Sequence, residues 1–368
     1  MKRSMDAVSR RTLLAGGGAL AGMAMSGCAL TGEAPGGKTM TQKTASDLAK
    51  AGALETADAV RSGEISALEA ADAAIARIEA VDGTINAVVV RDFERARAAA
   101  KALDASRKPG DARRFLGVPM TVKESNDVAG LPSTWGFEQF KDLNAARDAV
   151  VVERLKAEGA IILGKTNVPV ALGDWQSVNP IYGRTVNPFD HARSPGGSSG
   201  GAAAALATGM VPLEIGSDIG GSIRFPAHMC GVLGHKPTYG IVPQRGHLFP
   251  GTDGCDAPLA VVGPMARNVA DMAACLEVIA GPEAGGGYRL DLPPARASTL
   301  KGCRVRVIAE MPDVPVDGDT RAGLARLVDA LRAEGVTVSE GTADMPDLAE
   351  MVPSYVRMLM TVISRGDP

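Results

Sequence analysis

Two glycine-rich segments place serines where a nucleophile could act. The segment 216–222 (GSDIGGS) follows a strand candidate over residues 211–215 and ends in Ser222. Glycines permit a tight curl in which several N–H groups converge on one point, which is the geometry of an oxyanion hole. A glycine-rich turn that only buries a serine fits the same spacing equally well. The pattern therefore makes Ser222 a candidate nucleophile and leaves its role open.

The second segment, 196–200 (GGSSG), matches the GxSxG nucleophile elbow, with Ser198 as the nucleophile. An elbow needs a strand that leads directly into the turn. The preceding residues 187–195 contain two prolines and show no strand pattern. The downstream acid and base of such an esterase could formally be Asp218 and one of His228, His235 and His247. An esterase of this kind is therefore a distant third interpretation.

A third segment, 159–166 (GAIILGKT), matches the phosphate-binding pattern GxxxxGK[ST] letter for letter. The residues between the glycines should curl around phosphate, but Ala160 to Leu163 are apolar and typical of a strand. A helix should then begin, yet Pro169 follows closely, and the residue before a proline resists helical geometry. We predict a buried strand here and no nucleotide site.

The elements around these motifs alternate between strands and helices. Leu68, Ala71, Ile75 and Ile78 share one face of an alanine-rich helical region over residues 44–105, and Ser66 with Glu69 forms a capping-box pattern. Strands are predicted at 115–122, 160–164, 211–216, 304–309 and 336–339, and helices at 148–158, 202–208, 320–333 and 351–364. This alternation favours a layered α/β architecture.

Composition narrows the class of protein further. The 368 residues carry a formal charge of −3 and are 45% hydrophobic. A chain without basic blocks is a poor nucleic-acid binder, because binding to phosphate needs a positive surface. The four histidines and five cysteines form neither an HExxH nor a paired CxxC pattern, so we expect no metal site and no cofactor.

The first residues resemble an export signal. Arg10 and Arg11 precede an uncharged stretch, as in twin-arginine signals, and residues 25–28 (MSGC) resemble a bacterial lipobox. We predict a signal peptide over 1–27, a linker over 28–43, and Cys28 as a candidate lipid anchor. The expected location is the periplasm, either free or as a membrane-anchored lipoprotein.

Four segments taken together resemble the amidase signature family. They are GVPMTVKES at 117–125, GAIILGKTNVP at 159–169, GGSSGGAAAA at 196–205 and GSDIGGSIRFPA at 216–227. They occur in family order, and Ser198 lies 24 residues before Ser222, as in the family. The resemblance implies a single large α/β/α layered domain around a mixed twisted sheet, spanning 44–368. It also implies hydrolysis of a small-molecule carboxylic amide to an acid and an amine or ammonia.

The resemblance further implies a Ser–Ser–Lys triad. Ser222 matches the nucleophile, Ser198 the bridging serine whose peptide bond with Gly197 is cis, and Lys123 the general base. Burial at the end of a strand would lower the pKa of Lys123, so that the neutral amine could accept a proton near neutrality. The backbone N–H groups that match the oxyanion hole belong to Ile219, Gly220, Gly221 and Ser222. Asp218 and Arg224 match supporting positions, where a purely structural pair is an equal alternative.

The chain departs from the family pattern at three places. Glu124 stands where Asp is common, and Val170 stands where Glu is common after the Asn-x-Pro turn. Family members usually continue well past residue 368, so we expect a domain that lacks its C-terminal part. Two alternatives to an active amidase therefore stay open. They are an amidotransferase subunit of a tRNA-dependent complex and an inactive truncated remnant.

Overall fold

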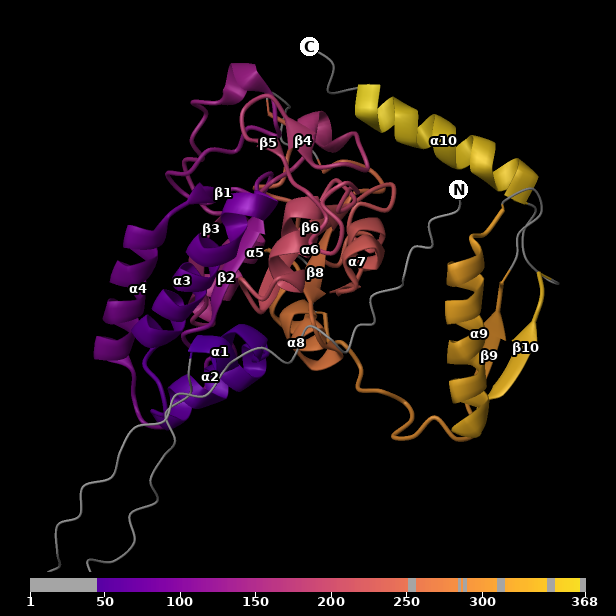
Figure 1. Ribbon diagram of the computed structural model, residues 1–368, viewed down its shortest axis with the longest axis horizontal. Coiled ribbons are helices and arrows are strands. Elements are labelled where there is room, and N and C mark those ends of the chain that lie inside the picture. Colours follow the sequence, from indigo (N-terminus) through magenta and orange to yellow (C-terminus); the bar gives the residue numbers. More distant parts are fainter. Residues whose placement is uncertain are drawn as a thin grey trace, which may run out of the picture. The chain divides into compact units, whose positions relative to one another are not determined.

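The computed structural model describes residues 45–250, 256–283, 286, 290–309, 315–342 and 348–364. A mixed six-stranded sheet with the order β1-β3-β2-β6-β8-β7 forms its centre (Figure 1). Its strands are β1 (Val88–Arg91), β2 (Pro119–Lys123), β3 (Ile161–Thr166), β6 (Leu213–Asp218), β7 (Leu233–Gly234) and β8 (Val261–Ala266). Strand β2 runs parallel to both β3 and β6, whereas β1, β8 and β7 pair with their neighbours in the antiparallel sense.

Helices cover both faces of this sheet. They are α1 (Ala45–Lys50), α2 (Ala53–Ser62), α3 (Ala67–Ile85), α4 (Phe93–Ser106), α5 (Val150–Ala157), α6 (Gly200–Ala207), α7 (Arg224–Cys230) and α8 (Val269–Ile279). One hydrophobic cluster joins the sheet to α3, α4 and α6, and a second joins it to α5 and α8. The result is the layered α/β/α arrangement that the alternation of elements predicts.

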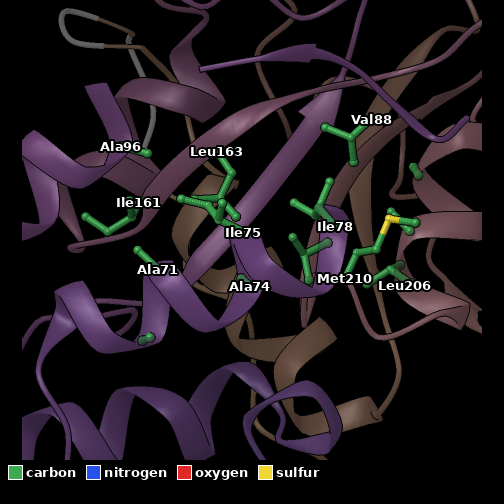
Figure 2. Close-up of a cluster of buried hydrophobic side chains, with 14 of the residues drawn as sticks. Ala71, Ala74, Ile75, Ile78, Val88, Ala96, Ile161, Leu163, Leu206 and Met210 are labelled. Carbon is green, nitrogen blue, oxygen red and sulfur yellow. The ribbon is translucent and has the colours of Figure 1, made fainter. Parts of the chain in front are cut away.

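The strands contribute side chains to both clusters, because successive residues of a strand point to opposite faces of the sheet. In β3, Ile161 and Leu163 belong to the first cluster and Ile162 to the second. Figure 2 shows Ile161 and Leu163 with Ile75 and Ile78 of α3 in the first cluster. The apolar face predicted for this helical segment is thus the face that packs on the sheet.

The start of α3 confirms the predicted capping box. The Ser66 hydroxyl accepts a hydrogen bond from the Glu69 N–H at 3.0 Å, and the Glu69 carboxylate accepts one from the Ser66 N–H at 2.8 Å. The two residues satisfy each other's backbone donors at the end of the helix, where the helix itself offers no acceptor.

Two predictions about the elements need correction. Residues 44–105 are not helical throughout, because β1 separates α3 from α4 and pairs with β3. Its sequence is Val88-Val89-Val90-Arg91, and β-branched residues favour a strand over a helix. The strand predicted at 115–122 is formed only from Pro119 to Lys123, so Lys123 is the last residue of β2 and not the residue after it.

The C-terminal strands form a sheet of their own. They are β9 (Arg304–Val307) and β10 (Thr337–Glu340), which pair in parallel and are connected through α9 (Gly318–Ala333). Helix α10 (Leu348–Ser364) follows. The short elements are β4 (Val178–Asn179), β5 (Gly183–Arg184) and the 3-10 turns η2 (Glu138–Phe140) and η3 (Val170–Leu172).

The predicted signal peptide, linker and Cys28 lie outside the described residues. Within the part of the chain that the structure does describe, no helix is long and apolar enough to span a bilayer.

Candidate active site

The candidate base Lys123 and the supporting residue Asp218 lie at the edge of the sheet where three parallel strands end. Lys123 is the last residue of β2, Thr166 the last of β3 and Asp218 the last of β6. Parallel strands bring their carboxyl ends to the same edge of a sheet, and such edges commonly carry the ligand sites of α/β folds. Residues from three distant parts of the sequence are thereby gathered at one edge.

Lys123 is fully buried and bonded to two serines. Its Nζ donates to the Ser198 Oγ at 2.6 Å and to the Ser217 Oγ at 2.9 Å. Burial lowers the pKa of Lys123 to about 7, although the nearby charge of Asp218 acts in the opposite direction. A substantial fraction of this amine is therefore neutral near pH 7, which is the state that a general base needs.

Ser198 is presented by the turn that precedes α6. The peptide bond between Gly197 and Ser198 is cis, as the resemblance implies. The next residue, Ser199, donates its N–H to the Ser222 carbonyl at 3.1 Å. This bond joins the segment of the candidate relay serine to the segment of the candidate nucleophile, and both serines are buried.

Asp218 holds the loop that carries Ser222. Its two carboxylate oxygens accept hydrogen bonds from the N–H groups of Gly221 at 2.9 Å and Ile223 at 3.1 Å. Arg224 adds a bidentate ion pair through its Nε at 3.0 Å and its Nη2 at 2.8 Å. Burial would raise the pKa of Asp218, but the pairing with Arg224 and these N–H bonds outweigh it and lower the pKa. Asp218 and Arg224 thus form a structural pair that fixes the loop.

The same contacts change the expected oxyanion hole at one position. The Gly221 N–H donates to Asp218, so it is engaged inside the protein and is not aimed at a substrate oxygen. The N–H groups of Ile219, Gly220 and Ser222 form no hydrogen bond within the described part of the chain. Three of the four expected donors are therefore unengaged.

Two residues at the site have contacts that the sequence did not predict. Ser217 is the second partner of Lys123. Glu124 is fully buried and accepts from the Thr134 N–H at 2.7 Å and the Trp135 N–H at 3.0 Å, which fastens the loop 133–136 beside the end of β2. The contact of Ser217 follows from the pairing of β2 with β6, which one sequence does not reveal.

The two competing motifs have structural explanations. The phosphate-loop pattern 159–166 contains β3, as predicted, and its Lys165 is buried and donates to the Ser133 Oγ at 2.8 Å. For the nucleophile elbow, residues 185–199 contain no strand before the turn. Across the residues that are described, no group of three or more His, Cys, Asp or Glu side chains is arranged to hold a metal ion.

Comparison with known proteins indicates the same family as the sequence motifs do. The family model described as amidase matches residues 69–365. A glutamyl-tRNA(Gln) amidotransferase subunit of Roseiflexus castenholzii is 39% identical over 298 residues, which cover 80% of this chain and 59% of that protein. Indoleacetamide hydrolase of Bradyrhizobium diazoefficiens is 39% identical over 302 residues, covering 80% and 56%. The chain thus spans about three fifths of the length of these relatives.

A solved structure agrees with the predicted fold class. The structure of 6-aminohexanoate cyclic dimer hydrolase complexed with substrate superposes with a TM-score of 0.75 at 33% sequence identity, covering 87% of this chain and 66% of that chain. The prediction of a mixed α/β fold around a central mixed sheet is confirmed.

Proposed function

This chain belongs to the amidase signature family, and on that premise we propose that it hydrolyses a carboxylic amide through an acyl intermediate on Ser222. The observation that carries the proposal is the 2.6 Å contact between the buried Lys123 Nζ and the Ser198 Oγ. A lysine with a pKa of about 7 is matched to proton transfer near neutrality.

The first half of the reaction transfers the acyl group to the enzyme. Neutral Lys123 accepts the proton of the Ser198 hydroxyl, and Ser198 accepts that of Ser222. The Ser222 Oγ then forms a bond to the amide carbonyl carbon, and the carbonyl oxygen takes up the electron pair. The unengaged N–H groups of Ile219 and Gly220, with that of Ser222 itself, are the donors for this oxyanion.

Collapse of the tetrahedral intermediate breaks the carbon–nitrogen bond. Ser198 gives a proton to the departing nitrogen and recovers one from Lys123, so the amine leaves neutral and Lys123 is again a free base. Water then attacks the ester carbonyl of acyl-Ser222 through the same relay. The products are a carboxylic acid and an amine or ammonia, and Ser222 regains its proton.

The test compares serine variants in a hydrolysis assay. Ser222→Ala and Ser198→Ala are measured beside the wild-type protein on a panel of simple amides, with product amine quantified. We expect Ser222→Ala to abolish turnover and Ser198→Ala to reduce it strongly, with both proteins folded by circular dichroism. Full activity of Ser222→Ala would contradict the proposal.

A second candidate function is ammonia production within a tRNA-dependent amidotransferase. Its support is the 39% identity to the glutamyl-tRNA(Gln) amidotransferase subunit of Roseiflexus castenholzii. In that case glutamine would be the preferred amide, and hydrolysis would depend on added partner subunits. Turnover of simple amides by the isolated chain would favour the amidase. A chain that melts without cooperativity and turns over no amide would instead be an inactive remnant.

We also propose that the chain is exported. The support is the pair Arg10 and Arg11 before an apolar stretch, followed by Cys28. In a bacterial host with twin-arginine export, we expect the mature protein outside the cytoplasm. Substitution of both arginines by lysine should retain it inside, and Cys28→Ser should release it from membranes. Full-length protein in the cytosol of the wild-type strain would contradict this.

A further inference from the structure

Two aromatic side chains, Trp175 and Phe225, pack together beside the segments that carry the candidate serines. The rings of Trp175 and Phe225 lie 5.0 Å apart between centroids and are tilted by 35°. This spacing is within the range of favourable aromatic contacts. Trp175 is nevertheless 58% exposed, although a large apolar side chain usually gains most of its stabilisation from burial. Its apolar surface is available to a ligand.

Trp175 lies on the segment that touches the turn of Ser198. A Cβ atom placed on Gly197 would lie 2.5 Å from the Asp174 carbonyl oxygen and 2.7 Å from that of Gln176. The backbone on both sides of Trp175 therefore packs directly on the residue that precedes the candidate relay serine. The Ser194 hydroxyl also donates to the Trp175 carbonyl at 3.1 Å, which ties the segment down.

Phe225 lies on the segment that carries Ser222. It is three residues beyond the candidate nucleophile, and its N–H donates to the Gly221 carbonyl at 2.7 Å. Asp218 and Arg224 fix the same loop. The aromatic pair therefore bridges the two segments that carry the reacting serines, and both of its members are held by backbone contacts.

We propose that Trp175 and Phe225 form an aromatic subsite that binds a flat, apolar substituent on the amine side of the substrate amide. This inference rests on the proposed function. Ser198 must deliver its proton to the departing nitrogen, so the amine substituent lies on the Ser198 side of the scissile bond. The backbone of residues 174–176 packs on Gly197, the neighbour of Ser198, so Trp175 belongs to the segment next to the serine that delivers this proton. The favoured class of substrate is accordingly an N-aryl amide.

The kinetic test uses three amides that differ in where the ring is attached. Acetanilide carries it on the amine, benzamide on the acyl group, and acetamide has none. We expect Trp175→Ala to lower the ratio of kcat/KM for acetanilide to that for acetamide about tenfold. Trp175→Phe should restore most of the ratio, because a ring remains to stack. An equal fall on all three amides, or a fall on benzamide alone, would overturn the assignment.

Phe189→Ala is the matched control for this test. Phe189 is another aromatic side chain, 73% exposed, and it makes no ring contact among the described residues. We expect its removal to leave the acetanilide ratio unchanged. A fall as large as that of Trp175→Ala would show that any exposed aromatic residue has this effect, and would overturn the specific subsite.

A binding test separates this inference from the proposed function. The sequence has two tryptophans, and Trp135 is buried. Titration of the Ser222→Ala protein with acetanilide should shift tryptophan emission to shorter wavelength as the ring covers Trp175, and Trp175→Phe should remove the shift. Hydrolysis of acetanilide by the wild type without any shift overturns the subsite alone. A shift without wild-type hydrolysis of any of the three amides keeps the subsite and overturns the proposed function, and the absence of both the shift and hydrolysis overturns both.

Discussion

Two buried lysines on neighbouring parallel strands differ in their hydrogen-bond partners and in the charges near them. Lys123 on β2 donates to the hydroxyls of Ser198 and Ser217, and burial lowers its pKa to about 7. Lys165 on β3 donates to the Ser133 hydroxyl and the Pro132 carbonyl. Burial lowers the pKa of Lys165 to about 8, while the charges of Glu124 and Asp127 oppose the shift.

A buried lysine acts as a base only where it is connected to a nucleophile. Both amines are fully buried, so burial alone does not distinguish them. Lys165 lies near two carboxyl groups, which favour its charged form. Its hydrogen-bond partners have no link to a reacting serine. Lys123 is bonded to a serine whose segment is joined to that of Ser222. The connection to the nucleophile, more than the lowered pKa, assigns the role.

The largest expected effect is the loss of the base. Lys123→Met keeps an apolar stem of similar length and removes the amine. We expect kcat to fall by roughly 10²- to 10⁴-fold, the usual contribution of general acid–base catalysis. The measurement is steady-state hydrolysis beside thermal unfolding. Activity within threefold of wild type would show that Lys123 is not the base.

Lys165→Met is the matched variant on the neighbouring strand, and its effect should appear as stability. Removal of the amine leaves the Ser133 hydroxyl and the Pro132 carbonyl without their donor in a buried site. We expect a loss of about 1–3 kcal/mol in the free energy of unfolding, measured by urea denaturation. If Lys165→Met stayed as stable as wild type and lost as much activity as Lys123→Met, the contrast between the lysines would be wrong.

The pH dependence should follow Lys123. Its amine is protonated and inactive as a base below a pKa of about 7 and neutral above it. We therefore expect kcat/KM to rise about tenfold from pH 6 to pH 8 and then to level off. The residual activity of Lys123→Met should lack this rise. A wild-type rate that falls over the same interval would contradict a lysine base.

The smallest effect concerns Ser217. Its hydroxyl accepts a hydrogen bond from Lys123, and such a bond favours the charged amine over the neutral one. We expect Ser217→Ala to lower the apparent pKa of the pH–rate profile and to reduce the plateau by about threefold. The control is Ser66→Ala, which removes a helix cap and should lower stability by about 1 kcal/mol without moving the profile. An upward shift in Ser217→Ala would reverse the assigned role of this hydroxyl.

The elements with strong local patterns could be predicted from the sequence. The face of α3, its capping box and the strand predicted at 160–164, which forms as β3 over Ile161–Thr166, all follow from local residue types. Strand β8 could not be predicted, because its sequence VVGPMA contains a glycine and a proline. It forms through antiparallel pairing with β6 along its whole length, so tertiary contacts override its local preference.

The candidate site could also be predicted only in part. The resemblance placed Lys123, Ser198 and Ser222 by their motifs, and the structure brings their segments together. The motifs do not show that the Gly221 N–H donates to Asp218, because this bond depends on how the loop closes on the carboxylate. Nor do they place Trp175 beside Phe225, which are 50 residues apart and in no shared motif.

The most direct measurement of the central claim is the position of a covalent label. A fluorophosphonate probe forms a stable adduct with an activated serine, and peptide mass spectrometry of the labelled wild-type protein locates it. We expect a single adduct on Ser222, with labelling greatly slowed in Lys123→Met. An adduct on Ser198, or labelling of Ser222 that proceeds equally fast without Lys123, would contradict the central claim.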